Sequence, residues 1–209
     1  MSTVINQILS TAFADECSLS ERKAEISVPQ HFSVTGVVLA AGAGTRFGMP
    51  KVLADGGRWL RLGVAALREG GCDDVVVVLG AAIVDVPPPA RAVVAGDWSD
   101  GLSASVRAGV LAAGATSGFV ALTTVDTPDV SAATVRRVLA AACASESGLA
   151  RARYGGRPGH PVAIARRHWP QLLATLSGDD GAGPFLNGRD DVVAVECADL
   201  ATGRDIDER

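Results

Sequence analysis

A glycine-rich segment ending at Lys51 has the residue types that bind a chain of phosphates. Glycines such as Gly42 and Gly44 let backbone N–H groups approach phosphate oxygens without obstruction by a Cβ atom, so a side chain at either position is expected to block that approach. Arg46 and Lys51 add positive charge. The spacing fits neither a Walker A loop nor the dinucleotide-binding fingerprint, since the third glycine, Gly48, comes one residue late. A phosphate-binding loop and a plain β-to-α turn with two solvated cations both remain open.

Apolar runs alternate with amphipathic segments around this loop. The second helix is predicted to begin with Ser103 as its N-cap. Alternation at this spacing predicts a doubly wound α/β domain with a mostly parallel sheet, whose ligands bind beyond the carboxyl ends of the strands. The loops after Ala40, Ala95 and Val125 are therefore expected to line the site. Strands are predicted at 34–40, 75–79, 92–95 and 119–125, and helices at 59–69, 103–113 and 132–143.

The remaining segments of the chain have weaker patterns. Residues 1–32 have mixed charge and no sustained apolar period, so we expect a mobile leader that the folded domain, residues 33–209, does not need. After Gly148 the elements shorten, which predicts a short antiparallel edge to the sheet or a substrate lid. These shorter elements are predicted at 149–154, 161–164, 166–176 and 192–196.

Charge and cysteine usage favour a small-molecule ligand. The 209 residues have a net charge of -4, so no global positive field would concentrate nucleic acid or an anionic membrane. The four cysteines lie far apart without a C-x-x-C pair, which favours reduced thiols over a zinc site or a disulfide framework. The N-terminus lacks the pattern of a signal peptide, and we expect a cytoplasmic protein. The oligomeric state stays open at this stage.

The glycine-rich segment, LAAGAGTRFGMPK, resembles the N-terminal motif LAAGxGxRxGxxK of the MobA/MocA-like nucleotidyltransferases at every fixed position. Further segments agree in the same order, and the similarity spans Val34 to Asp207. The resemblance implies a Rossmann-like nucleotidyltransferase fold. The matching segments are W-S-D-G-L-S-A-S-V-R-A-G at 98–109, V-D-T-P at 125–128, G-H-P at 159–161 and G-D-D-G-A at 178–182.

The resemblance also implies an activity. A phosphate on an acceptor, of the molybdopterin type, attacks the α-phosphorus of a nucleoside triphosphate, expected to be CTP, and pyrophosphate leaves. Arg46 and Lys51 would balance the charge of the triphosphate. Asp126 would hold Mg²⁺, because a hard cation prefers carboxylate oxygen together with phosphate and water; its alternative is an Asx-type turn before Pro128. The backbone cradle would comprise Leu39, Ala40, Ala41, Gly42, Ala43, Gly44 and Thr45.

Five further residues receive implied roles, each with a structural alternative. Gly101, Ser103 and Ser105 would contact the base and ribose of the nucleotide, or else only cap the helix that follows. His160 would face the acceptor, or be a hydrogen-bonded structural histidine. Asp179 would assist at the substrate or metal, or cap a short helix.

The chain departs from the family pattern on the acceptor side. Asp180 and Gly183 stand where relatives often have basic residues, and the segment Asp205–Arg209 ends where relatives usually continue from D-I-D-T into a last helix. These departures suit a second candidate activity. The chain also resembles an actinobacterial branch of the family of the nicotine blue oxidoreductase type, in which NAD(P)H reduces a quinone, with FMN as a suspected cofactor. A non-catalytic nucleotide-binding module is the third interpretation.

Overall fold

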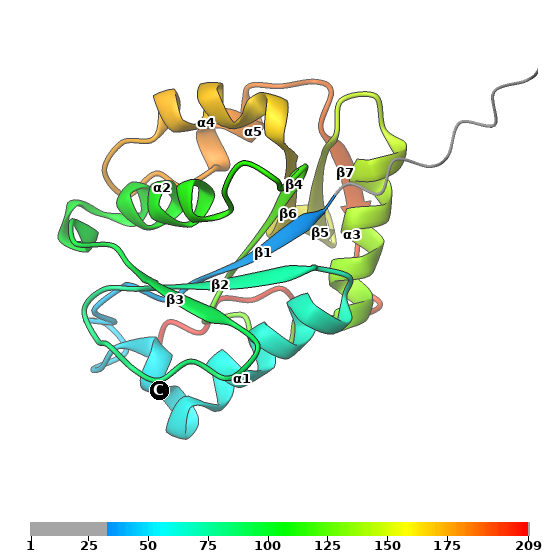
Figure 1. Ribbon diagram of the computed structural model, residues 1–209. Helices are drawn as coiled ribbons and strands as arrows, with labels where there is room; N and C mark the ends of the chain where they lie inside the picture. Colours follow the sequence, from blue (N-terminus) through cyan, green and yellow to red (C-terminus); the bar gives the residue numbers. More distant parts are fainter. Residues whose placement is uncertain (1–32, 209) are drawn as a thin grey trace, which may run out of the picture. The chain divides into compact units, whose positions relative to one another are not determined.

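The computed structural model describes residues 33–208, and its central element is a seven-stranded sheet with the strand order β3-β2-β1-β4-β6-β5-β7 (Figure 1). The strands are β1 Val34–Leu39, β2 Asp74–Leu79, β3 Arg91–Val94, β4 Phe119–Thr124, β5 Leu149–Tyr154, β6 Arg157–Ala165 and β7 Val193–Glu196. The helices are α1 Ala54–Glu69, α2 Leu102–Ala112, α3 Ala132–Ala144, α4 Trp169–Thr175 and α5 Gly183–Asn187, with 3-10 turns η1 Lys51–Leu53, η2 Trp98–Asp100 and η3 Arg166–His168.

The sheet is mostly parallel, which confirms the predicted fold class. Strands β3, β2, β1 and β4 run parallel, and β7 is parallel to β5. Only β6 runs antiparallel to both its neighbours, β4 and β5. The antiparallel pairing therefore falls after Gly148, as expected, but β6 lies inside the sheet instead of at its edge. The carboxyl ends of β1, β4 and β5 consequently share one edge with the start of β6.

Each face of the sheet has its own apolar core. Alternate residues of a strand point to opposite faces, so Val38 packs with α1 and α3 whereas Val37 packs with α2. Figure 1 shows α2, α4 and α5 on one face and α1 and α3 on the other. Val75 to Leu79 are all buried, as expected for a strand covered on both faces. The central strands are thus packed between two layers of helices.

Two helix starts differ from the predictions. Ser103 is not the N-cap of α2: Gly101 occupies that position, and Ser103 lies inside the helix with a buried side chain. Its backbone N–H instead donates to the carbonyl of Gly178 at 3.0 Å. Helix α1 is assigned from Ala54, but residues 55–57 have left-handed backbone angles, so its regular part begins beside the predicted start at Trp59.

Two further points concern the leader and membrane-spanning helices. The predicted leader, residues 1–32, lies outside the described residues. Within 33–208, no helix is long and apolar enough to cross a membrane.

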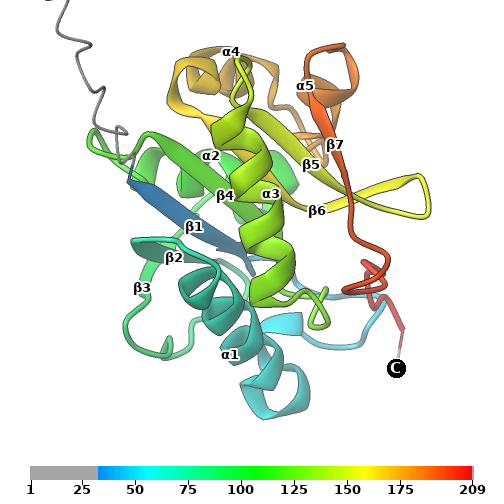
Figure 2. The same cartoon turned by 90° about the vertical axis from the view of Figure 1, so that its right-hand side faces the viewer.

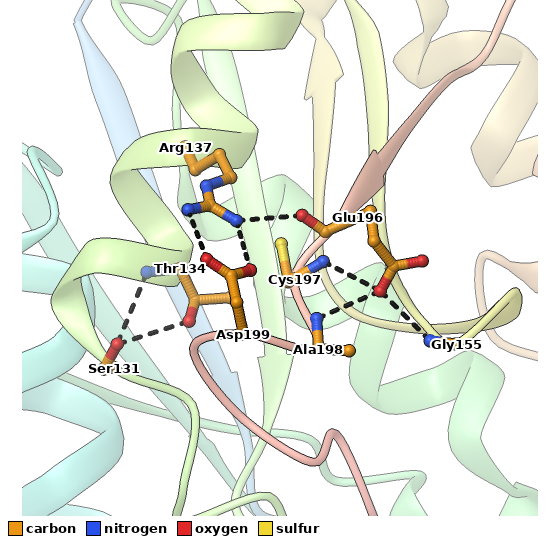
Figure 3. A network of polar contacts seen from close by, with 8 residues as sticks. All are labelled: Ser131, Thr134, Arg137, Gly155, Glu196, Cys197, Ala198 and Asp199. Carbon is orange, nitrogen blue, oxygen red and sulfur yellow. Dashed lines mark hydrogen bonds and ion pairs between the residues drawn. The ribbon is translucent and has the colours of Figure 1, made fainter.

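The segment after β7 returns to the edge of the sheet where the strands carry their carboxyl ends. Arg137 of α3 holds the start of this segment. It donates two hydrogen bonds to Asp199, of 2.6 and 2.9 Å, and a third to the carbonyl of Glu196 (Figure 3). The Asp129 carboxylate then accepts from the backbone and hydroxyl of Thr202. In Figure 2 the segment, in red, lies to the right of the lower end of α3 and beside the blue loop between β1 and α1. These contacts place the last described residues beside the glycine-rich loop.

Candidate nucleotide-binding site

A cleft of about 790 Å³ opens at the carboxyl ends of β1 and β4. The loops after Ala40, Ala95 and Val125 contribute to its walls, as the fold class predicted. It is lined by Leu39, Ala40, Ala41, Gly42, Ala43, Gly44, Thr45, Arg46, Phe47, Lys51, Trp98, Ser99, Gly101, Leu102, Ser105, Thr124, Val125, Asp126, His160, Asp179, Asp205 and Asp207.

The two glycines singled out in the loop have different structural roles. Gly44 has a φ of +62°, and a Cβ there would collide with the backbone carbonyl of Met49. The Gly44 carbonyl also accepts from the N–H of Gly48 at 2.8 Å, which closes the loop. At Gly42, by contrast, no atom lies within 4 Å of the position that a Cβ would take, so this residue faces open space. Gly44 is thus required by the loop itself, whereas Gly42 leaves room for a ligand to approach the backbone.

The Lys51 side chain joins three elements at the floor of the cleft. Its Nζ donates to Asp126 Oδ2 at 2.8 Å and to Asp207 Oδ1 at 2.9 Å. Desolvation acts against the ammonium, but these two carboxylates outweigh it and raise the pKa of Lys51. Lys51 therefore stays positively charged. Arg46, more exposed, lies 3.8 Å from the same Asp207 and adds a second cation at the mouth.

Asp205 adds negative charge to this cluster. Desolvation together with repulsion from Asp126 and Asp207 raises the pKa of the Asp205 carboxyl. The Asp207 carboxyl shows the reverse effect, because its hydrogen bond and charge interaction with Lys51 lower its pKa. When ionised, the three carboxylates Asp126, Asp205 and Asp207 carry one more charge than the two cations Lys51 and Arg46 balance. The excess favours a further cation.

Two buried oxygens in the cleft wall have no hydrogen-bond partner among the described residues: Asp126 Oδ1 and Thr124 Oγ1. A buried polar atom without a partner is costly, so these atoms indicate a ligand or water. No three His, Cys, Asp or Glu side chains within 33–208 form a ready-made metal site. Mg²⁺ is usually held by one or two carboxylates, with phosphates and water completing its coordination. The residues present fit such a cation.

The other predicted site residues are placed unevenly. Gly101, Ser105, Asp179 and His160 line the cleft, but Ser103 does not. Gly101 has a φ of +110°, and a Cβ there would meet the Gly178 carbonyl and Asp179, so this glycine permits the close approach of the loop before α5. Gly101 and Ser103 both contact the backbone of Gly178, so these two residues have a structural role in addition to any contact with a nucleotide.

His160 belongs to β6 and lines the cleft. Its Nδ1 lies 3.4 Å from the carbonyl of Leu122, and its own carbonyl accepts from Tyr154 at 2.6 Å. Desolvation is the largest effect on the ring and lowers the pKa of His160. A neutral imidazole held by β4 and β5 thus faces the cleft.

Comparison with known proteins identifies the family. The sequence profile of the MobA-like NTP transferase domain matches residues 36–193. The chain belongs to this family. A nicotine blue oxidoreductase from Paenarthrobacter nicotinovorans is 40% identical over 189 residues, which is 83% of this chain and 92% of that protein.

Solved structures agree with the MobA-like assignment. Rv0371c from Mycobacterium tuberculosis H37Rv is 29% identical with a TM-score of 0.69, over 85% of this chain and 94% of that one. A complex of the same protein with manganese has also been solved. A nucleotidyl transferase from Methanothermobacter thermautotroptrophicus is 26% identical with a TM-score of 0.63, over 78% of this chain and 87% of that one.

Several residues of this MobA-like cleft were not predicted from the sequence. Asp205 and Asp207 stood out only as part of a segment that departs from its relatives, yet both reach the floor of the cleft. The available signal in the sequence was a pair of aspartates separated by one apolar residue, Ile206, a spacing that can turn both carboxylates to one side of an extended chain. Thr124, at the end of β4, and Trp98, in η2, were missed as well. Trp98 offers the cleft an aromatic surface of the kind on which a planar base stacks.

Proposed function

We propose that this chain catalyses metal-assisted nucleotidyl transfer. A phosphate oxygen of the acceptor forms a bond to the α-phosphorus of a nucleoside triphosphate, the bond from that phosphorus to the bridging oxygen breaks, and pyrophosphate leaves. Such a reaction depends mainly on positioning and on neutralising charge. The nucleotide is CTP in this proposal, and the acceptor is a molybdopterin-type phosphate. We place the reaction in the cytoplasm.

The observation that carries the proposal is the buried, unpartnered Oδ1 of Asp126 beside the Lys51 ammonium. Asp126, with Asp205, would hold Mg²⁺ or Mn²⁺, and the cation would supply charge neutralisation at the α-phosphate. Lys51, beside Asp126, and Arg46, at the mouth of the cleft, bind the oxygens of the triphosphate. Backbone N–H groups of 40–45 approach the same oxygens, since Gly42 leaves that face open.

The part of the cleft formed by His160 and Asp179 suits the acceptor. His160 comes from β6 and Asp179 from the loop before α5, so both line the cleft without belonging to the glycine-rich loop. A neutral His160 offers one donor and one acceptor of hydrogen bonds. We assign to it the orientation of the attacking phosphate relative to the nucleotide.

The direct test is calorimetric titration of CTP into the protein with MgCl₂, with MnCl₂ and with EDTA. Tight binding is expected only with a divalent cation, and Asp126→Asn should abolish the metal dependence. Asp74→Asn serves as a control, because Asp74 pairs with Arg91 at the other end of the parallel strands. CTP binding by the unaltered protein that is as tight in EDTA as in MgCl₂, or an Asp126→Asn variant that keeps the full metal dependence, would contradict the proposal.

A second candidate is supported by the 40% identity with nicotine blue oxidoreductase. In that case the cleft holds NAD(P)H or FMN phosphate, a hydride passes from NAD(P)H to a quinone, and water supplies the proton that completes the reduction. Trp98 would then stack on a nicotinamide or flavin ring instead of a cytosine. An absorbance spectrum of the purified protein tests for flavin, because bound FMN absorbs visible light and the polypeptide itself does not.

A further inference from the structure

Arg151 of β5 is an arginine whose charge no described carboxylate balances. Its Nη1 donates to Asn187 Oδ1 at 2.9 Å, and its Nε is buried without a hydrogen-bond partner. Within residues 33–208 it forms no ion pair. Arg151 as a whole is half-buried, and only its Nε is fully shielded from water. Guanidinium groups shielded in this way are normally matched to carboxylates or phosphates, which they bind in a planar, two-pronged geometry. The free Nε therefore indicates a missing anionic partner.

The register of the sheet places Arg151 next to the cleft. Arg151 pairs with Val162 of β6, and His160 lies two residues earlier on that strand. Residues two apart on a strand share a face, so Arg151 points the same way as Leu149. The pairing of β5 with β6 shifts register after Arg151, and the nearness of His160 to Arg151 is shown instead by the charge interaction between the two side chains. Leu149 and Val162 both belong to the core under α2, α4 and α5. The Arg151 side chain consequently lies on that face, between His160 and the end of α5.

Two arginines of β5, Arg151 and Arg153, lie close enough to repel each other. Desolvation and repulsion from Arg153 lower the pKa of Arg151, and Arg151 in turn acts to lower the pKa of His160. The segment 178–183, which leads into α5, contributes no basic side chain. Arg151, from β5, instead brings a cation close to His160, which lines the cleft.

We propose that Arg151 binds an anionic group, phosphate or carboxylate, of the second substrate, and that it thereby selects an acidic acceptor. This assignment rests on the nucleotidyl transfer proposed above for the identity of the reaction. Arg151 approaches the acceptor through Nε and Nη2 while Asn187 holds Nη1 in place. His160, on the neighbouring strand, lies between this anion site and the nucleotide.

The test follows the ¹⁵N–¹H signal of Arg151 Nε by NMR, assigned by its loss in Arg151→Lys. One sample is titrated with sodium phosphate and another with sodium acetate. A saturable shift with phosphate alone supports a phosphate-bearing acceptor, and a shift with acetate supports a carboxylate. The Nε of Arg189 is an internal control, because it already donates to Asp191 at 2.8 Å and should not respond. No shift at Arg151, or equal shifts at both arginines, would overturn the proposal.

A second measurement separates this proposal from the proposed function. Calorimetry with CTP and MgCl₂ should give the same affinity for Arg151→Gln as for the unaltered protein, while phosphate affinity in the NMR titration of neighbouring signals falls about tenfold. If the unaltered protein fails to bind CTP, nucleotidyl transfer is wrong, but the anion titration still decides the role of Arg151. If CTP affinity falls together with phosphate affinity, Arg151 belongs to the nucleotide site and the acceptor assignment is wrong.

Discussion

Lys51 Nζ lies 2.8 Å from Asp126 Oδ2, although the two residues are 75 positions apart in the chain. The pair joins the glycine-rich loop after β1 to the turn after β4, and these strands are neighbours in the sheet. The Lys51 ammonium is suited to binding phosphate oxygens, and the Asp126 carboxylate is suited to binding a metal ion. Their separation in sequence and contact in space define the floor of the cleft.

The two glycines of the loop should respond differently to substitution. Gly42→Val should fold normally, because a side chain there meets open space, and it should weaken CTP binding by obstructing the backbone. Gly44→Ala should instead lower the free energy of unfolding by about 1–3 kcal/mol, since it forces a left-handed backbone and a contact with Met49. Denaturant unfolding and CTP titration measure the two effects. A Gly42→Val variant with unaltered CTP affinity would show that the backbone does not cradle the phosphates.

Asp205→Asn should stabilise the protein in the absence of ligand. The pKa of the Asp205 carboxyl is raised, so its ionisation costs more in the folded than in the unfolded state. That cost is absent below about pH 3, where both states are protonated, and it grows as the pH rises through the folded-state pKa. The melting temperature at pH 7 should rise by about 1–2 °C, with no gain near the acid limit.

Asp207→Asn is the matched control for that experiment. The same chemical change two residues away removes a carboxylate whose pKa is lowered by Lys51. Its ionised form stabilises the fold above its unfolded-state pKa, and that contribution disappears as the pH falls through the folded-state value. Asp207→Asn should therefore lower the melting temperature at pH 7. Equal shifts for the two variants would show that the charge cluster is not arranged as described.

Asp129 does not line the cleft but should affect metal binding there through the segment that it holds. Its carboxylate accepts from Thr202 at 2.7 Å through the backbone N–H and at 2.6 Å through the hydroxyl, which anchors the segment that carries Asp205. Asp129→Ala should raise the Mn²⁺ concentration needed for half-saturation, in the presence of CTP, by about tenfold. Electron paramagnetic resonance of free Mn²⁺ provides the measurement. Asp191→Asn, which breaks the Arg189 ion pair, should leave Mn²⁺ binding unchanged; an equal effect of both variants would exclude a specific anchor.

Much of this fold could be predicted from the sequence because local signals govern it. Apolar runs marked the strands, and a glycine-rich loop and a strand-end aspartate marked the cleft. The roles of Asp205 and Asp207 could not be predicted in this way. They depend on β7 pairing with β5 and on the contacts of Arg137 and Asp129 with the segment that follows.

The start of α2 was predicted wrongly for a similar reason. A serine before an apolar run is a common N-cap, but here Ser103 is one residue inside α2 because its N–H bonds to Gly178. That partner lies far along the chain, in the loop that covers Gly101. Tertiary contact, not local preference, decides where α2 begins.

Turnover measures most directly whether Asp126 supports metal-dependent nucleotidyl transfer. The unaltered protein, Asp126→Asn and Asp74→Asn are assayed for pyrophosphate release from CTP with a phosphate-bearing acceptor and for NAD(P)H oxidation with a quinone, each with MgCl₂ and with EDTA. We predict pyrophosphate release that needs both Mg²⁺ and Asp126, with Asp74→Asn fully active. NAD(P)H oxidation that persists in EDTA and in Asp126→Asn, without any pyrophosphate release, would contradict the proposed function.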